Sequence, residues 1–585
     1  MDRVIESYVK DFQQEYDYPG NLGKSELFER FVNHCIFSRL HSERFEVDDV
    51  TVGGGGDMAL DGVGIVVNDN LVFSREEVDE LKSKSRRLEV KFIFIQSKTS
   101  SKFDAGEIGN FMFGVGSFFS NQPLPKAANE EIKALKELAD YLYDNHSIDF
   151  DGNPSCSMYY VTTGSWQDDL NLLHRIQAEQ KKLEDTNLFE KNLVEFFPID
   201  SDHLKTIYKE LKNKVDKQIE FERHTIIPQV DGVSEAYIGI LPCNEYLKLI
   251  CSQDGTLLKS LFYDNVRDFQ GDNPVNREIS KTLESPSIKD SFVFLNNGVT
   301  IVAKSVQKTG FTFTIRDFQI VNGCQTSHII YENRNELDPS IYLPVKLIVT
   351  SNEEVTNRII KATNRQTEVK VEAFLSLQPF QKELEEFYGS FSNDKDESCR
   401  LYYERRSKQY DSQFSNIKKN KIVSVTYQIK CFISSFLRSP HSTHRYYGEL
   451  LKTNKDKIFI ESHSFYPYYT SCLTCHLFQD LVKKGKIKSK YRKYAYHVSM
   501  VAIILVHGIN PPPSREGKKT RDYCLKIVED LQDSRKCLKL FEQSLEIIES
   551  VAKSKQYSSL DIREIIRRKQ FSSDLVRFLE SESQS

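Results

Sequence analysis

Residues 90–98 have the sequence VKFIFIQSK, in which a continuous apolar run ends in three polar residues. A run of this kind predicts a strand that is buried on both faces, inside a sheet covered by helices. Because side chains alternate along a strand, Gln96 and Lys98 are expected to lie on one face and to emerge together where the strand ends. The polar end of this strand is therefore a candidate site.

The neighbouring segments predict the layers around this strand. Residues 25–40 have apolar side chains at helical spacing behind Ser25, and a Gly-rich turn at 53–56 leads into a short strand at 63–67. Further helices are expected at about 105–145 and 167–185, and further strands at about 158–163 and 193–198. This order of elements predicts an α/β sandwich of roughly 200 residues.

The length of the chain and the changes in composition along it indicate several domains. The 585 residues exceed the roughly 250–300 that one core supports. From about residue 218 the sequence resembles a second α/β unit rich in Asn, Gln and Gly, and beyond about 375 it becomes mostly helical. We therefore predict an α/β multidomain protein with domains at 1–217, 218–375 and 376–585.

The composition narrows the class of protein. The net charge of −5 excludes a uniformly basic nucleic-acid binder, so any such site should be a local patch with salt-dependent affinity. The 11 scattered cysteines do not form a disulfide pattern. The first residues are charged and lack the apolar segment of a signal peptide, and no run of 18 apolar residues occurs. We expect a cytoplasmic protein that does not contact a membrane.

Four residues of the first domain together suit metal-assisted phosphodiester hydrolysis. This reaction needs a carboxylate and a second oxygen ligand for Mg²⁺ or Mn²⁺, and an ammonium group that orients water and stabilises charge on phosphorus. Asp61, just before a predicted strand, is the expected principal ligand, and Gln96 can supply an amide oxygen. Glu29, on the first predicted helix, is a further carboxylate, and Lys98 is the ammonium group. Each feature alone is more often structural, but their joint order favours a nuclease site.

The arrangement Asp61…Gln96-Ser-Lys98 resembles the active site of the PD-(D/E)XK superfamily, in the Gln-containing variant typical of Mrr-like restriction nucleases. In that subgroup a helix with a Phe-Glu pair, here Phe28-Glu29, precedes an Asp-Gly-Gly-Ile-Asp stretch, here Asp57-Met-Ala-Leu-Asp61. The resemblance implies a restriction-endonuclease-like fold and Mg²⁺-dependent endonuclease activity.

This sequence departs from the subgroup at two points. Met58 and Ala59 replace two glycines, and an insertion at 74–87 explains the long spacer before Gln96. Asp57 is expected to be a turn residue rather than a ligand. The insertion carries a basic cluster that either contacts phosphates or is a solvated surface. The cluster consists of Lys82, Lys84, Arg86 and Arg87.

Several motifs of the second half resemble the AIPR family, whose name refers to abortive infection phage resistance. The motifs are Asn265–Glu278, Phe294–Ile301, Phe318–Thr326, Ile360–Gln366 and Tyr402–Arg406. The resemblance covers roughly residues 225–530 and implies a bacterial defence protein.

The polar side chains of these motifs are candidates to line one cleft that binds nucleic acid or a nucleotide, because their amide and guanidinium groups present fixed donors and acceptors. The candidates are Arg267, Asn276, Arg277, Asn297, Asn322, Gln325, Asn364 and Arg365. Alternatively, Asn297-Gly298 and Asn322-Gly323 are tight hairpin turns. A basic and aromatic stretch at 483–496 either follows a phosphate backbone or is a solvated helix face.

The sequence therefore predicts a metal-dependent nuclease of a bacterial anti-phage system, of the abortive-infection or restriction type. One alternative is a catalytically degenerate sensor or adaptor that binds nucleic acid. Another is a nucleotide-binding regulator, or an enzyme that acts on a nucleotide in the central domain. The expected partner is nucleic acid, with DNA favoured over RNA, while a homo-oligomer and a companion defence protein stay open.

Overall fold

The computed structural model of the chain describes residues 2–41, 44–85, 87–125, 128–167, 169–212, 216–252, 255–262, 274–285, 288–335, 337–363, 375, 378–393, 396–405, 409–410, 417–554, 556–557 and 562–584. The chain forms two compact units. The first comprises Met1–Phe12 and Gly23–Ala373, and the second comprises Gln13–Leu22 and Phe374–Ser585. The division into three domains proposed from the sequence stays a prediction.

The N-terminal part of the first unit is built on a five-stranded mixed sheet with the order β2-β1-β3-β4-β5. Its strands are β1 (Gly62–Val67), β2 (Asn70–Val72), β3 (Val90–Lys98), β4 (Ser155–Thr162) and β5 (Val194–Ile199). Strand β1 runs antiparallel to β2 and β3, whereas β3, β4 and β5 are parallel. Its helices are α1 (Arg3–Glu15), α2 (Lys24–Leu40), α3 (Val47–Val50), α4 (Arg75–Lys84), α5 (Ala105–Phe118), α6 (Glu130–His146), α7 (Leu170–Glu184) and α8 (Ser201–Lys212).

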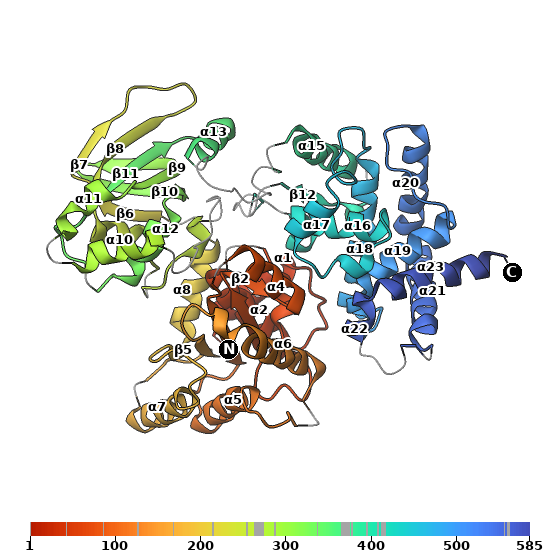
Figure 1. Ribbon diagram of the computed structural model, residues 1–585, viewed down its shortest axis with the longest axis horizontal. Coiled ribbons are helices and arrows are strands. Elements are labelled where there is room, and N and C mark those ends of the chain that lie inside the picture. Colours follow the sequence, from red (N-terminus) through yellow and green to blue (C-terminus); the bar gives the residue numbers. More distant parts are fainter. Residues whose placement is uncertain are drawn as a thin grey trace. The chain divides into compact units, whose positions relative to one another are not determined.

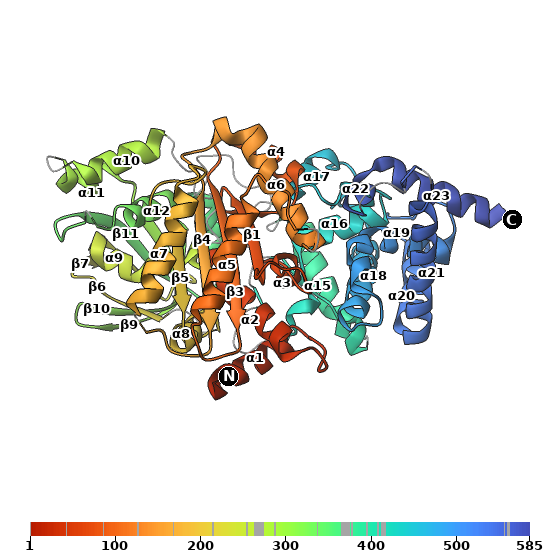
Figure 2. The same ribbon diagram turned by 90° about the horizontal axis from the view of Figure 1, so that it is seen from below.

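Helices cover both faces of this sheet, as the apolar strand predicted. On one face α2 approaches so closely that a Cβ atom at Gly64 would lie 2.3 Å from the ring of Phe37. Gly64 pairs with Ile93, so this is the odd-numbered face of β3. On the other face the rings of Phe94 and Phe118 of α5 are 5.2 Å apart. Figure 2 shows α5 and α7 side by side in front of the sheet.

The structure confirms the helix predicted at 25–40 and the strand at 90–98, and it adds further elements. Helices α1, α3 and α8 and the short strand β2 were not expected from the sequence. The insertion contains α4, which begins where the Ser74 hydroxyl accepts a hydrogen bond from the Glu77 amide. The N-terminal part is therefore a three-layer α/β/α sandwich.

The remainder of the first unit contains a six-stranded sheet with the order β6-β10-β9-β11-β8-β7. Its strands are β6 (Asp216–Glu220), β7 (Arg223–Ile226), β8 (Glu235–Pro242), β9 (Val299–Thr309), β10 (Thr312–Asn322) and β11 (Tyr342–Val349). Its helices are α9 (Cys243–Ile250), α10 (Pro274–Glu284), α11 (Phe292–Leu295), α12 (Cys324–Glu332) and α13 (Glu353–Thr363). Tyr246 of α9, Ile329 of α12 and Leu347 of β11 share one buried core. Figure 1 shows α10 and α12 side by side over this sheet.

Within the first unit, polar contacts connect the part built on the five-stranded sheet with the part built on the six-stranded sheet. The Arg39 guanidinium donates a 2.7 Å hydrogen bond to the Ser252 hydroxyl, and Lys259 forms an ion pair with Asp69 in the β1–β2 turn. Burial acts to raise the pKa of Asp69, but the charges of Lys259 and Lys91 outweigh it and hold the pKa well below its usual range. The β1–β2 turn therefore carries a charged carboxylate that contacts the part of the unit built on the six-stranded sheet.

The second unit is mostly helical, as predicted. Its helices are α15 (Pro379–Asn393), α16 (Val425–Ser435), α17 (Tyr447–Thr453), α18 (Tyr466–Lys483), α19 (Ala495–His507), α20 (Lys518–Gln532), α21 (Ser534–Ala552), α22 (Ile562–Arg567) and α23 (Lys569–Gln584). A two-stranded parallel sheet joins β12 (Tyr402–Glu404) to β13 (Ile422–Ser424). Across the described helices, none is both long enough and apolar enough to cross a bilayer.

A segment from the start of the chain belongs to this second unit. Asp17 Oδ1 lies 2.9 Å from Lys418 Nζ, and Lys483 Nζ lies 3.8 Å from the centre of the Tyr18 ring. Lys483 opens the basic and aromatic stretch at 483–496, whose role in binding nucleic acid stays a prediction. Helix α1 therefore begins in one compact unit and ends in the other.

Candidate functional site

The candidate site is centred on Asp61, which directly precedes β1 and is 5% exposed. Its Oδ2 atom accepts hydrogen bonds from Gln96 Nε2 at 2.7 Å, from the Ser97 amide at 2.7 Å and from the Ser97 hydroxyl at 3.0 Å. Burial raises the pKa of Asp61 to about 6, although the Ser97 bonds oppose the shift. The structure therefore brings Asp61 and Gln96 into direct contact.

Gln96 uses only its amide nitrogen inside the fold. The side chain is 3% exposed, and its Oε1 atom is buried with no hydrogen-bond partner among the described residues. An amide oxygen in that state is costly unless it meets a partner from outside the fold. Gln96 Oε1 is thus available to a bound ion or water.

Glu29 approaches the site from α2, on the face of the sheet opposite to Gln96. Burial raises the pKa of Glu29 to about 7, and the negative charge of Asp61 contributes to the increase. A positive charge placed between the two carboxylates would relieve this repulsion. Asn33, one helical turn further along α2, donates to the Asp61 carbonyl at 3.0 Å and fixes α2 against β1.

Lys98 lies on the same face of β3 as Gln96, as strand alternation predicted. Its Nζ atom is 2.8 Å from Glu107 Oε2, and both side chains are partly exposed. Glu107 was missed by the sequence analysis. Glu107 stands in the first turn of α5, whose N-cap is Asp104. The Asp104 cap is the sequence signal that could have predicted a helix start, and with it the Glu107 carboxylate, near the end of β3.

The turn before Asp61 holds two non-glycine residues in a backbone conformation that glycine usually adopts. Met58 and Ala59 adopt φ angles of 57° and 61°, in the left-handed region that glycine tolerates best. The Asp57 carboxylate accepts a 2.9 Å hydrogen bond from the Ala59 amide, so Asp57 is a turn residue, as predicted. Helix α5 packs on this turn, because a Cβ atom at Gly114 would lie 2.1 Å from the Met58 carbonyl oxygen.

The donor set fits a hard divalent cation in its chemistry. Asp61, Glu29 and Gln96 offer two carboxylates and one unpartnered amide oxygen, which are ligand types of Mg²⁺ and Mn²⁺. Within the described part of the chain, no group of three or more His, Cys, Asp and Glu side chains is arranged to hold a metal ion.

The central motifs partly meet at one end of the six-stranded sheet. Gly323 lies so close to Gly298 that a Cβ atom would be 3.1 Å from the Gly298 carbonyl oxygen. This contact joins the segment of the exposed Asn297, just before β9, to the junction of β10 and α12. Asn322 ends β10 there, and the half-buried Gln325 stands in the first turn of α12. The hairpin-turn interpretation is wrong for both Asn-Gly pairs.

Their glycines have other local roles. Gly298 leads into β9 and Gly323 is the N-cap of α12 with φ 101°, whereas the β9–β10 hairpin turns at Gly310. The amide of Asn322 donates to the Thr363 carbonyl at 2.7 Å. Asn322 therefore ties the end of β10 to the end of α13.

The other central candidates are only partly described. Arg267, Asn364 and Arg365 lie outside the described residues, and Asn276 and Arg277 lie on α10 without described side chains. The single cleft expected from the sequence stays a prediction. Two residues that the sequence analysis missed, Asn296 and Thr326, bond to each other at 3.1 Å and connect the segment before β9 to α12.

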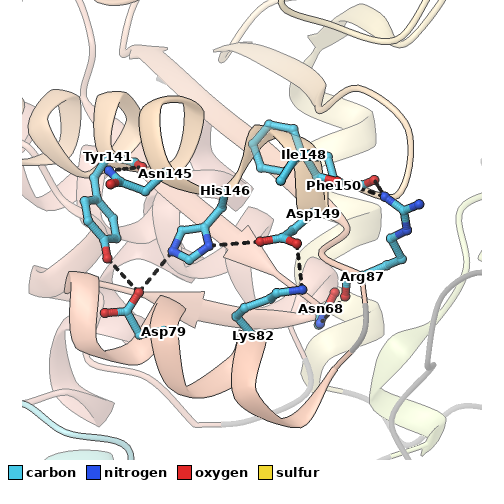
Figure 3. Close-up of polar contacts among 10 residues, drawn as sticks. All are labelled: Asn68, Asp79, Lys82, Arg87, Tyr141, Asn145, His146, Ile148, Asp149 and Phe150. Atoms are coloured by element: carbon cyan, nitrogen blue, oxygen red, sulfur yellow. Dashed lines mark hydrogen bonds and ion pairs between the residues drawn. The ribbon is translucent and has the colours of Figure 1, made fainter.

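A second polar cluster in the first unit, the His146 cluster, is shown in Figure 3. His146 Nε2 lies 3.0 Å from Asp79 Oδ1 and Nδ1 lies 3.4 Å from Asp149 Oδ2. Asp79 also accepts from the Tyr141 hydroxyl at 2.6 Å, and Lys82 Nζ lies 2.7 Å from Asp149 Oδ1. The Lys82 hydrogen bond lowers the pKa of Asp149. This cluster links α4 to the end of α6.

Two basic residues of the insertion form contacts in or beside this cluster. Lys82 pairs with Asp149, and Arg87 donates to the carbonyl oxygens of Ile148 and Phe150 at 2.9 Å and 3.2 Å. Arg86 lies outside the described residues, and the side chain of Lys84 is not described. Lys82 and Arg87 therefore act first as internal contacts of the sandwich.

Comparison with known proteins identifies the family. Residues 262–580, more than half of the chain, match the family described as AIPR protein. The chain therefore belongs to the AIPR family. The match starts and ends later than the resemblance at 225–530, and it extends into α23. Neither the curated proteins nor the solved structures include a match to this chain.

Proposed function

We propose that this chain is a metal-dependent nuclease that acts in bacterial abortive-infection defence against phages. Membership of the AIPR family supports the defence role. The observation that carries the nuclease role is the Asp61–Gln96 pair, a buried carboxylate of raised pKa beside an unpartnered buried amide oxygen. A site that keeps such costly groups is expected to bind an ion or a reactant.

In this proposal the N-terminal sandwich is a PD-(D/E)XK-like domain. Asp61 and Gln96 hold Mg²⁺ or Mn²⁺, and Glu29 completes the ligand set directly or through water. Once bound, such an ion supplies Lewis-acid activation of water and neutralises phosphate charge. Because the pKa values of Asp61 and Glu29 lie near neutrality, protons compete with the ion, and activity should rise between about pH 6 and 8.

The chain's own residues then direct hydrolysis of the phosphodiester. Lys98 orients the attacking water and stabilises negative charge on phosphorus, and Glu107 fixes the Lys98 ammonium through their ion pair. The bond from the water oxygen to phosphorus forms as a phosphorus–oxygen ester bond breaks. The departing oxygen takes up a proton from solvent, and the proton released by the water returns to solvent.

The deciding experiment is cleavage of plasmid, linear duplex, single-stranded DNA and RNA with Mg²⁺, Mn²⁺ or EDTA. We expect cleavage only with a metal ion, reduced at least roughly 100-fold in Lys98→Ala. Lys102→Ala is the matched control, because this exposed lysine follows the same strand without an assigned role.

Two outcomes would contradict the proposed nuclease site or its activity. Equal cleavage by wild type and Lys98→Ala would remove Lys98 from the site. Binding of nucleic acid without metal and without cleavage would favour the catalytically degenerate sensor. Phage challenge of cells that express each variant then distinguishes the sensor from the nuclease. A nuclease requires that Lys98→Ala abolish protection there while Lys102→Ala preserves it.

A further inference from the structure

A second unpartnered polar atom lies in the sheet beside Gln96. Tyr160 is fully buried, and within the described part of the chain its hydroxyl has no hydrogen-bond partner. A phenylalanine would fill the same space without leaving a buried polar group unpaired. The hydroxyl therefore points to a partner that comes from outside the fold.

The strand register places Tyr160 next to Gln96. Residue 160 of β4 pairs with residue 96 of β3 in a parallel ladder, so both side chains project from the same face of the sheet. Lys98, two residues further along β3, projects from this face as well. Three side chains of the proposed catalytic site thus share one face at the ends of two neighbouring strands.

The Tyr160 ring is fixed and its hydroxyl stays protonated. The rings of Phe103 and Phe111 lie 5.9 Å and 6.1 Å from it and restrict its motion. Burial raises the pKa of Tyr160 above its usual value, and the charges of Glu107 and other nearby carboxylates add to the shift. At neutral pH the hydroxyl is consequently a hydrogen-bond donor held in one place.

We propose that Tyr160 is a further catalytic residue, which together with Gln96 holds the water that attacks phosphorus. One water satisfies both groups. It donates a hydrogen bond to one lone pair of Gln96 Oε1, whose other lone pair holds the metal ion, and it accepts a hydrogen bond from the Tyr160 hydroxyl. A lone pair of the water is then left to form the bond to phosphorus. This inference rests on the proposed nuclease function and deepens it.

The test compares Tyr160→Phe with Tyr159→Phe, the next residue of β4. Tyr159 projects from the opposite face, where it stacks on Phe197 with 4.8 Å between ring centres. For Tyr160→Phe we expect kcat to fall roughly 10- to 100-fold with KM for nucleic acid within about twofold. Tyr159→Phe should cleave within about twofold of wild type.

Thermal unfolding without added metal gives a second readout that does not depend on activity. Loss of an unpaired buried hydroxyl should leave the melting temperature of Tyr160→Phe unchanged or raise it by roughly 2 °C. A decrease of several degrees would show that the hydroxyl has a partner inside the fold, and this result would overturn the inference.

Lys98→Ala, assayed in parallel, separates the inference from the proposed function. If Lys98→Ala is inactive and Tyr160→Phe cleaves like wild type, the role of Tyr160 fails and the nuclease stands. If Lys98→Ala also cleaves like wild type, or wild type does not cleave, the nuclease site itself is wrong. The role of Tyr160 is then wrong as well.

Discussion

The Asp61 site and the His146 cluster use similar groups in the same compact unit, yet their electrostatics are opposite. In the His146 cluster both ring nitrogens face carboxylates, and Lys82 lowers the pKa of Asp149. At the other site burial raises the pKa of Asp61 to about 6. There, buried polar atoms on Gln96, Tyr160 and Asn33 lack a partner among the described residues.

This difference separates a structural cluster from a candidate reactive one. A network in which donors meet acceptors stabilises the fold and joins α4 to α6. Buried groups with an unfavourable charge or an unfilled hydrogen bond reduce stability, and in the proposed function a bound ion or reactant compensates for this cost. The comparison can be tested by removing one group from each cluster.

Asp61→Asn should have the largest effects, and these should be opposite for the reaction and for stability. We expect cleavage to fall at least roughly 100-fold, because a neutral amide is a poor substitute for a carboxylate ligand. The free energy of unfolding at pH 8 should rise by about 2 kcal/mol, because a buried charge of raised pKa is removed.

The stability difference between Asp61→Asn and wild type should depend on pH. The folded-state pKa of Asp61 lies above its unfolded value, so wild type loses stability as the pH rises from about 4 to about 6. The advantage of Asp61→Asn should therefore vanish below about pH 4 in urea unfolding. Lower stability of the variant at pH 8 would instead make Asp61 a structural carboxylate.

His146→Ala should lower the free energy of unfolding by roughly 2 kcal/mol, because two carboxylates lose the imidazole between them. Cleavage per folded molecule should be unchanged, as measured below the melting temperature. The matched control is His174→Ala, an exposed histidine of α7 that should shift stability by less than about 0.5 kcal/mol. Loss of cleavage in folded His146→Ala would make the two clusters functionally alike.

Ala59→Gly should have the smallest effect, a gain of about 0.5–1 kcal/mol in the free energy of unfolding. Glycine adopts the φ of 61° at this turn without the steric penalty of a Cβ atom. Ala134→Gly in α6 is the control and should lose about 1 kcal/mol, because a helix favours alanine. Equal losses in both variants in thermal unfolding would show that the turn before Asp61 is not strained.

The sequence revealed those parts of the candidate site that depend on local pattern. The apolar run predicted β3, alternation placed Gln96 with Lys98, and the Gly-rich turn placed Asp61 before β1. Glu107 and Tyr160 were missed, because their positions depend on how α5 packs and on the β3–β4 register. Such long-range pairings leave no periodic signal in the sequence.

The same limit applies to the central domain and to the second unit. The Asn-Gly pairs suggested hairpin turns, whereas both glycines have positive φ in other settings, and Gly323 is the N-cap of a helix. Nothing in residues 13–22 indicated that they pack with residues beyond 374, since such contacts span most of the chain.

That packing has a consequence for biosynthesis. Asp17 and Tyr18 are translated before their partners Lys418 and Lys483, which follow more than 400 residues later in the sequence. The segment 13–22 can therefore make these contacts only after translation has passed Lys483, when the first unit can already have folded. A truncated translation product that ends before Lys418 would leave this segment without its second unit.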